Sequence, residues 1–251
     1  MKRRIKVIMF YVLIMCIVCI SESIYAITLR ELAIQAEAKH NKFKKEVKSM
    51  IIVGEINSKE SGRAVRGKLK LWRKGEKTRQ EEVIIQMPDM LNMPEFTKGM
   101  KKDMEVITIC DGKNEWVYSS FINKWMKIKE EEQKIENNQW FEDIPREAKL
   151  LGTDNVKKNS AYVIEVPKST GIYSKIWIDK KNFVVLKEEE KDLEGNIVTS
   201  VNLDYRRVKG NYEIPYKTKE YKNGQLISTM IIKSVKINKK ISDSLFKPNT
   251  K

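Results

Sequence analysis

The chain has 251 residues, with 49 Lys and Arg against 34 Asp and Glu, so its formal net charge is +15 at pH 7. Such a charge favours acidic partners such as anionic lipid headgroups, whereas a single histidine excludes a zinc site built on several imidazoles. The sequence contains no glycine-rich phosphate loop, nucleophile elbow or H-E-x-x-H motif, and we expect no catalytic residue, no cofactor and no metal.

Residues 1–26 have the parts of a secretory signal peptide. A cationic start at residues 2–6 precedes an apolar run at residues 7–20, which is shorter than the roughly 20 residues of a membrane-spanning helix. Cleavage near Ala26 would release residues 27–251 outside the cytoplasm, as a single domain. An uncleaved membrane anchor is one alternative, and a lipoprotein modified at a cysteine of the apolar run is another.

Export restricts the chemistry of the released chain. Only Cys110 remains after cleavage, so no internal disulfide can form and the core must be stabilised by burial. Export also separates the chain from nucleic acid, and we expect no nucleic-acid partner. The lysines are spread along the whole chain, which favours a solvated strand face over one basic patch.

The first element after the signal segment is an amphipathic helix predicted at residues 28–48. Leu32, Ala36 and Phe43 recur at helical spacing, with Lys, Glu and Asn between them. His40 lies in this lysine-rich stretch, and we expect it to be exposed.

Beyond this helix the hydrophobic period changes to two. In residues 65–72, Leu69 and Leu71 alternate with Lys68 and Lys70, which predicts a half-buried antiparallel strand with one wet face. Similar stretches occur at residues 50–56, 83–87, 104–110, 116–119, 125–128, 161–166, 175–178, 183–188, 197–205, 212–221 and 226–237.

The connections between these strands are short, and turn-forming pairs that tolerate positive φ occupy residues 111–112, 195–196, 210–211 and 223–224. A meander this long should curl, because large open sheets rarely stay flat. The predicted fold is therefore mainly β (α+β): a curled antiparallel half-barrel of about 11 strands with an N-terminal helix and short lid helices over its concave face.

Two segments interrupt the meander, and we expect both to form short helices or lids. Residues 88–102 are rich in methionine, whose flexible side chain suits a loosely fitting acyl chain. Residues 138–150 carry apolar side chains at roughly helical spacing around Pro145. The alternative is that these residues simply fill the core.

Several motifs follow one another in an order that is itself informative. They are Gly67-Lys68-Leu69-Lys70-Leu71-Trp72-Arg73, Asp111-Gly112-Lys113-Asn114-Glu115-Trp116-Val117-Tyr118, Ile176-Trp177-Ile178-Asp179, Val184-Val185-Leu186-Lys187, and a C-terminal run through Ile214-Pro215 to Leu245-Phe246-Lys247-Pro248. In this order they resemble the LolA-like outer-membrane lipoprotein-sorting proteins, whereas the methionine-rich insert departs from the founding carriers of that family.

The resemblance implies a periplasmic lipoprotein carrier that holds acyl chains in a half-barrel cavity and passes them toward the outer membrane. The lipid-binding residues that it implies, on the inner face and the lid, are Leu69, Leu71, Val83, Ile85, Met90, Met93, Met100, Trp116, Tyr118, Trp140, Phe141, Ile176 and Ile178. Arg73 is the positional match for an arginine that holds the lid closed.

The expected partners are an acylated lipoprotein or lipid cargo and membrane-bound donor and acceptor proteins, met by a monomer in transient contact with the membrane. Two other function classes remain open. One is a lipid-sensing or protein-interaction module that regulates a membrane-anchored partner. The other is a secreted hydrolase with paired carboxylates, which would show turnover of an ester or glycoside.

Overall fold

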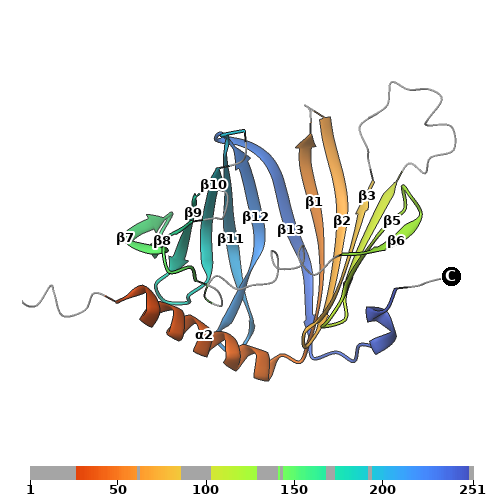
Figure 1. The fold of residues 1–251 in the computed structure, drawn as a ribbon, viewed down its shortest axis with the longest axis horizontal. Coiled ribbons are helices and arrows are strands. Elements are labelled where there is room, and N and C mark those ends of the chain that lie inside the picture. Colours follow the sequence, from red (N-terminus) through yellow and green to blue (C-terminus); the bar gives the residue numbers. More distant parts are fainter. Residues whose placement is uncertain are drawn as a thin grey trace, which may run out of the picture.

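The computed structural model describes residues 27–60, 63–85, 103–128, 141, 144–167, 173–191 and 194–248. Over these ranges the chain forms an N-terminal α-helix, thirteen strands and a short 3-10 helix (Figure 1). The elements are α2 (Leu29–Glu46), β1 (Ser49–Glu60), β2 (Arg63–Lys74), β3 (Lys77–Ile84), β4 (Met104–Cys110), β5 (Glu115–Ser119), β6 (Lys124–Lys127), β7 (Lys149–Val156), β8 (Asn159–Pro167), β9 (Tyr173–Asp179), β10 (Val185–Lys191), β11 (Ile197–Lys209), β12 (Tyr212–Lys222), β13 (Gln225–Ile237) and η1 (Asp243–Phe246). The predicted signal peptide and the methionine-rich segment 88–102 lie outside the described residues.

Helix α2 confirms the predicted amphipathic helix and starts at a capping box. The side chain of Thr28 accepts a hydrogen bond from the Glu31 backbone amide, and the Glu31 carboxylate accepts one from the Thr28 amide at 2.8 Å. Lys44 and Lys45 in the last turn complement the helix dipole. In the described part of the chain, no helix has the length and hydropathy that crossing a membrane requires.

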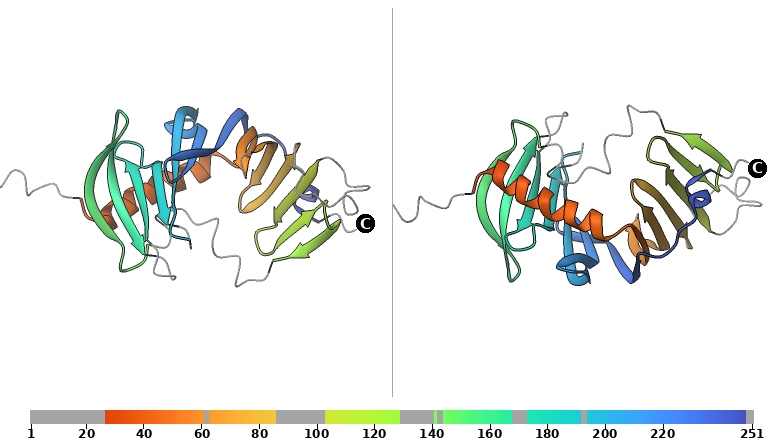
Figure 2. Two further views of the ribbon diagram at one scale, coloured as in Figure 1. Left: turned by 90° about the horizontal axis from the view of Figure 1, so that it is seen from above. Right: turned by 90° about the horizontal axis from the view of Figure 1, so that it is seen from below.

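All thirteen strands belong to one sheet, in the order β6-β5-β4-β3-β2-β1-β13-β12-β11-β10-β9-β8-β7. Every neighbouring pair is antiparallel. The sheet curls into an arc, and α2 crosses the lower end of the open side (Figures 1 and 2). Because β6 and β7 are the two edges of the sheet and do not pair with each other, the predicted curled half-barrel is confirmed.

The sheet has thirteen strands, more than the predicted number of about 11. The helix predicted at residues 138–150 is also wrong over the residues that are described there, 141 and 144–150, which form no helix. The chain turns at the end of segment 138–150, where the Ala148 amide donates to the Pro145 carbonyl at 3.0 Å. Strand β7 then begins at Lys149. Pro145 disfavours a helix through this segment, because proline lacks the backbone N–H that a helix interior needs. Pairing with the neighbouring strand β8 then stabilises β7.

We call the face of the sheet that α2 covers the inner face, and the opposite one the outer face. Leu32 of α2 packs against Ile164, Ile176 and Ile178 near one edge of the sheet. Phe43, one turn from the end of α2, belongs to a second cluster with Met50, Ile52 and Ile232 in the middle of the sheet. The ring of Phe43 also stacks on Tyr212, with centroids 3.5 Å apart. Both ends of α2 are thus anchored to the inner face.

The C-terminal 3-10 helix η1 covers part of the outer face. Phe246 is buried in a cluster with Trp72, Ile107 and Ile109, whose side chains point away from α2. The Arg79 guanidinium donates to the Leu245 carbonyl at 3.2 Å. Helices α2 and η1 therefore lie on opposite faces of the sheet.

An ion pair at the start of η1 gives a pH-dependent contribution to stability. The ammonium groups of Lys74 and Lys77 lie 2.7 and 2.8 Å from the Asp243 carboxylate, and their hydrogen bonds lower its pKa from 3.8 to about 2. A lowered folded-state pKa means that this stabilisation is complete above about pH 4 and is lost as the pH falls through about 2.

We therefore expect Asp243→Asn to lower the melting temperature at pH 7. The difference from the wild type should shrink between about pH 4 and pH 2. Thermal unfolding followed by circular dichroism across this pH range measures it. A difference that stays constant down to pH 2 would contradict a role for the ionised carboxylate.

Candidate functional site

The half of the inner face that runs from β13 to the edge strand β6 carries apolar side chains that no described element covers. Strand register places them on the same side as the residues that pack on α2. They form the inner apolar surface, which consists of Ile56, Leu69, Ile84, Met104, Val106, Val117, Met126 and Met230. All are half-buried except Met126, which is 44% exposed. Of the four core clusters among the described residues, none includes them.

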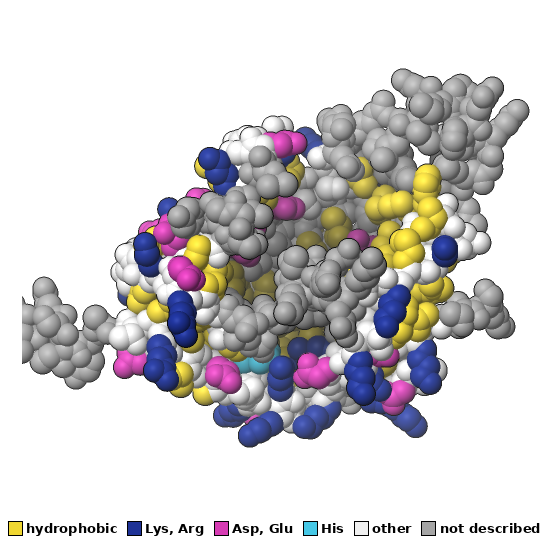
Figure 3. Space-filling view, in the orientation of Figure 1, with side chains coloured by type: hydrophobic (Ala, Val, Ile, Leu, Met, Phe, Trp, Pro, Cys, Tyr) yellow, Lys and Arg dark blue, Asp and Glu magenta, His cyan; other side chains and the backbone are white. Residues whose placement is uncertain are grey.

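The inner apolar surface is hollow and contains few polar groups. Figure 3 shows hydrophobic side chains within the hollow and along one rim, with Lys and Arg along its lower edge. The polar side chains on this surface include Thr108, Ser119, Gln80 and Glu82, and the Gln80 amide donates to the Glu82 carboxylate at 2.8 Å. Gly67 lies between Ile56 and Ile84 across the strands and contributes no side chain. The result is an open, largely apolar concavity.

The sequence-predicted site residues do not all share this face. Leu69, Leu71, Ile176 and Ile178 lie on the inner face, whereas Val83, Ile85, Trp116 and Tyr118 lie on the outer face. Trp116 and Tyr118 pack against the cluster that includes η1. Met90, Met93, Met100 and Trp140 lie outside the described residues.

Burial separates the inner-face residues further. Ile176 and Ile178 are buried beneath α2 with Leu32, and Leu71 packs on the Phe43 cluster. Of the predicted residues that the structure describes, only Leu69 belongs to the inner apolar surface. The sequence prediction did not include the other members of that surface. Ile84, Val106 and Val117 follow from Leu69 only when the register of β2, β3, β4 and β5 is known.

Arg73 points to the inner face at the end of β2, where it reaches α2. Its guanidinium carbon lies 5.4 Å from the centroid of the Phe43 ring, in a cation–π arrangement. The structure thus places Arg73 at the contact between the sheet and the helix that crosses its open side.

A small cavity of about 190 Å³ lies between α2 and the inner face of β10 to β12. Its walls include His40, whose ring meets that of Phe141 edge-on at a centroid distance of 5.4 Å. His40 is only 5% exposed, so the prediction of an exposed histidine is wrong. Position 40 continues the buried stripe of Leu32 and Ala36 at a spacing of four residues, and this geometry overrides the polarity of the side chain.

Polar groups around this cavity are held in hydrogen bonds. The Lys39 ammonium donates to the Asn182 carbonyl at 2.8 Å, and burial lowers the pKa of Lys39. The Tyr205 hydroxyl and the Asn202 amide both donate to the Val185 carbonyl. Burial raises the pKa of Tyr205, so its hydroxyl stays protonated as the donor. These contacts fix the walls of the cavity.

Two of the motifs that carry the resemblance form turns. The Asp111 carboxylate accepts hydrogen bonds from the Lys113 and Asn114 amides at 2.9 and 2.8 Å, and these bonds hold its pKa below the usual range. Asp179 accepts in the same way from the Lys181 and Asn182 amides. Both aspartates therefore close hairpins. Within the described ranges, no group of three His, Cys, Asp or Glu side chains is arranged to hold a metal ion.

Comparison with known proteins gives one family match and a consistent fold. A family model with the description "Uncharacterized protein" matches residues 92–250. No curated protein matches the sequence. An outer membrane lipoprotein-sorting protein domain from Vibrio parahaemolyticus is 12% identical, with a TM-score of 0.60, over 86% of this chain and 95% of that chain.

Two further solved structures share the fold. A DUF1329 family protein from Desulfovibrio piger is 12% identical and has a TM-score of 0.59, over 87% of this chain and 95% of that chain. A LolA superfamily protein from Nitrosomonas europaea is 15% identical and has a TM-score of 0.54, over 89% of this chain and 99% of that chain. At these identities the likeness shows that the fold is LolA-like.

Proposed function

The chain belongs to the family of uncharacterized proteins matched at residues 92–250 and has a LolA-like fold, and from this premise we propose that it is a periplasmic carrier of acyl chains. Its cargo would be a lipid or an acylated lipoprotein, carried toward the outer membrane. In this proposal residues 1–26 direct export and are cleaved near Ala26. The structural likeness to the outer membrane lipoprotein-sorting protein domain from Vibrio parahaemolyticus supports such a role.

The inner apolar surface is the observation that carries the proposal. The side chains of Ile56, Leu69 and Met230 are half-buried neighbours on this concave face. An acyl chain that lies on them would remove apolar surface from water. Each buried methylene contributes about 0.8 kcal/mol, so a chain of about 16 carbons could gain roughly 10 kcal/mol if it were mostly enclosed. No covalent step, cofactor or catalytic residue is needed.

A carrier must also release its cargo, so its cover cannot be held closed with much net stability. Helix α2 lies at the lower end of the sheet (Figure 1), so an acyl chain on the inner apolar surface can leave without unfolding of the sheet. Arg73, through its contact with Phe43, is our candidate for the latch that holds this cover in place. Transfer would run from a weaker to a stronger membrane-bound holder, and the carrier would act as a monomer in transient contact with each membrane.

Native mass spectrometry of the protein purified from its own export compartment, followed by lipid extraction, tests the proposal. We expect an acylated species at close to one-to-one stoichiometry, which the protein exchanges with lipid vesicles. An empty protein that also fails to take up a fluorescent fatty acid would contradict the carrier function. A stable complex with a membrane-anchored protein, without exchange of lipid, would instead indicate an interaction module.

A further inference from the structure

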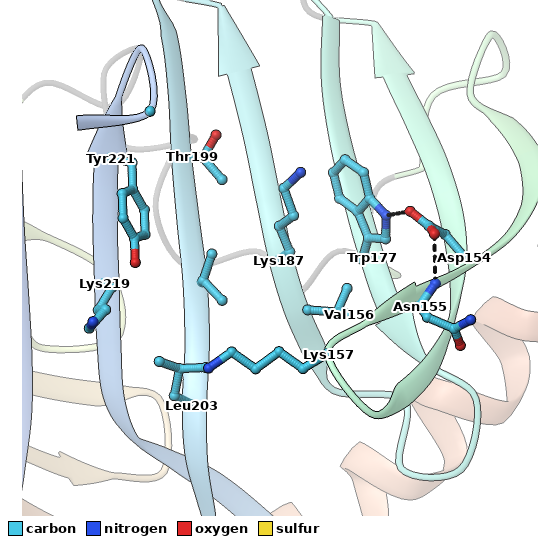
Figure 4. A pocket seen from close by; sticks show the side chains of 12 residues that line it. Asp154, Asn155, Val156, Lys157, Trp177, Lys187, Thr199, Leu203, Lys219 and Tyr221 are labelled. Carbon is cyan, nitrogen blue, oxygen red and sulfur yellow. Dashed lines mark hydrogen bonds between the residues drawn. The ribbon is translucent and has the colours of Figure 1, made fainter. Parts of the chain in front are cut away.

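A second cavity, of about 430 Å³, opens on the outer face, on the opposite side of the sheet from the inner apolar surface. Figure 4 shows it spread over β9 to β12 and bounded by the turn between β7 and β8. Its volume lies within the range of about 300–1,000 Å³ that is usual for small-molecule sites. This cavity is not part of the proposed carrier surface, because cross-strand partners place its side chains on the other face.

Three lysines from three separate elements line this cavity. Lys157 extends across the strands from the β7–β8 turn, Lys187 lies on β10, and Lys219 lies on β12 (Figure 4). Lys187 is already engaged, because its ammonium lies 2.9 Å from the Glu189 carboxylate and 4.0 Å from the centroid of the Trp177 ring. The ammonium groups of Lys157 and Lys219 have no hydrogen bond or ion pair with any side chain or carbonyl of the described residues.

The carboxylate in the cavity wall is also engaged. Asp154 accepts a hydrogen bond from the Trp177 indole at 2.9 Å and another from the Asn155 amide at 2.7 Å, and these bonds lower its pKa. Asp154 therefore stays ionised but has its oxygens turned toward the wall. The positive charge of Lys157 and Lys219 remains available for an anion from outside.

Lys157 holds a backbone conformation that lysine rarely adopts. Its φ is +56°, in the left-handed region that favours glycine or asparagine. The exposed side chain of Lys157 extends from the β7–β8 turn across the mouth of the cavity (Figure 4). The two-residue turn between Val156 and Asn159 accounts for this φ, because tight hairpin turns require positive φ.

The remaining wall supplies hydroxyl groups and aromatic rings. Thr199 and Tyr221 border the upper part of the cavity, on β11 and β12 (Figure 4). Ammonium and hydroxyl donors that line one cavity suit a phosphate ester, whose oxygens accept charge-assisted hydrogen bonds.

We propose that this outer cavity binds a phosphate ester, held by Lys157 and Lys219. The phosphate could belong to a soluble ester or to a phospholipid headgroup, and the chemistry of recognition is the same for both. Such a site would let the protein contact an anionic headgroup with its outer face while its inner face holds another ligand.

Two-dimensional NMR of the purified protein tests this proposal, because the indole N–H of Trp177, one of five tryptophans, lies in the cavity wall. The variant Trp177→Phe assigns its signal. We expect glycerol 3-phosphate to shift this signal saturably. Lys157→Ala and Lys219→Ala should each raise the dissociation constant about tenfold, the usual scale for losing a charge-assisted hydrogen bond. The matched control is Lys158→Ala, which removes an exposed lysine from the same turn and should change it by less than about twofold.

A vesicle arm distinguishes the two sources of phosphate. A lipid headgroup is the source if the wild type binds phosphatidylglycerol vesicles but not phosphatidylcholine vesicles, and if Lys157→Ala no longer prefers phosphatidylglycerol. Binding of glycerol 3-phosphate without this vesicle dependence assigns the site to a soluble ester. The proposal is overturned if neither probe moves the Trp177 signal, or if Lys158→Ala weakens binding as much as Lys157→Ala does.

A second variant separates binding from folding. Lys157→Gly relieves the left-handed backbone, so we expect a melting temperature higher by about 2–4 °C together with the same loss of phosphate affinity as Lys157→Ala. Unchanged affinity in this more stable variant would show that the Lys157 side chain does not bind the ligand.

Discussion

Ile84→Glu is expected to weaken the capture of a fluorescent fatty acid by at least about tenfold, whereas Ile85→Glu should change it by less than about twofold. Both isoleucines are half-buried and adjacent in the chain, but they lie on opposite faces of the sheet. A carboxylate at position 84 would lie on the inner apolar surface beside Glu82, where an acyl chain would have to desolvate it. At position 85 it would meet Arg66 on the outer face.

Fatty-acid titration of the two variants measures this contrast, and far-ultraviolet circular dichroism checks that both keep their strands. Because the substituted side chains are half-exposed, we expect both proteins to fold. Equal loss in the two variants would remove the inner apolar surface as the binding site. Loss in Ile85→Glu alone would move the site to the outer face.

Leu32→Ala is expected to lower the free energy of unfolding by about 2–5 kcal/mol. Leu32 is fully buried and is the residue through which the first half of α2 reaches Ile164, Ile176 and Ile178. Its truncation leaves a cavity that strands of a continuous sheet cannot close by moving together. Urea unfolding at constant protein concentration gives the value.

Ile34→Ala is the matched control for Leu32. Ile34 lies on the same helix and has the same number of carbons, but it is 55% exposed. We expect a change within about 0.5 kcal/mol. A similar loss in both variants would contradict the burial of Leu32 against the sheet as the source of the effect, because alanine itself favours the helix in both cases.

The faces of β2 could be predicted from the sequence, but those of β3 and β5 could not. In β2, lysines alternate with leucines, so polarity alone separates the faces. In Ile84-Ile85 and in Trp116-Val117-Tyr118 both faces carry apolar residues, because η1 covers the outer face of this half of the sheet. Only the register with neighbouring strands then decides which side chain faces inward, and register is a property of pairs of strands.

Other differences also have local causes. His40 is buried because its helical position, four residues after Ala36, outweighs its polarity. Strand β7 escaped prediction because Leu150 and Leu151 break the alternation at an irregularity before Gly152, whose φ is +124°. The Asn223-Gly224 turn, in contrast, was predicted correctly because both of its residues have positive φ.

The order of the strands has a consequence for how the chain folds. Strands β1 to β6 are a meander in which each strand pairs with its neighbour in sequence, and β7 to β13 are a second one. Only the pairing of β1 with β13 joins them, and contacts beside it link residues 190 positions apart. Each meander can form from local hairpins, so the β1–β13 pair is the one strand pairing of high contact order in the described sheet. This pairing can form only after nearly the whole chain is available. A circular permutant that begins at β7 and ends at β6 would place every strand beside its neighbour in sequence.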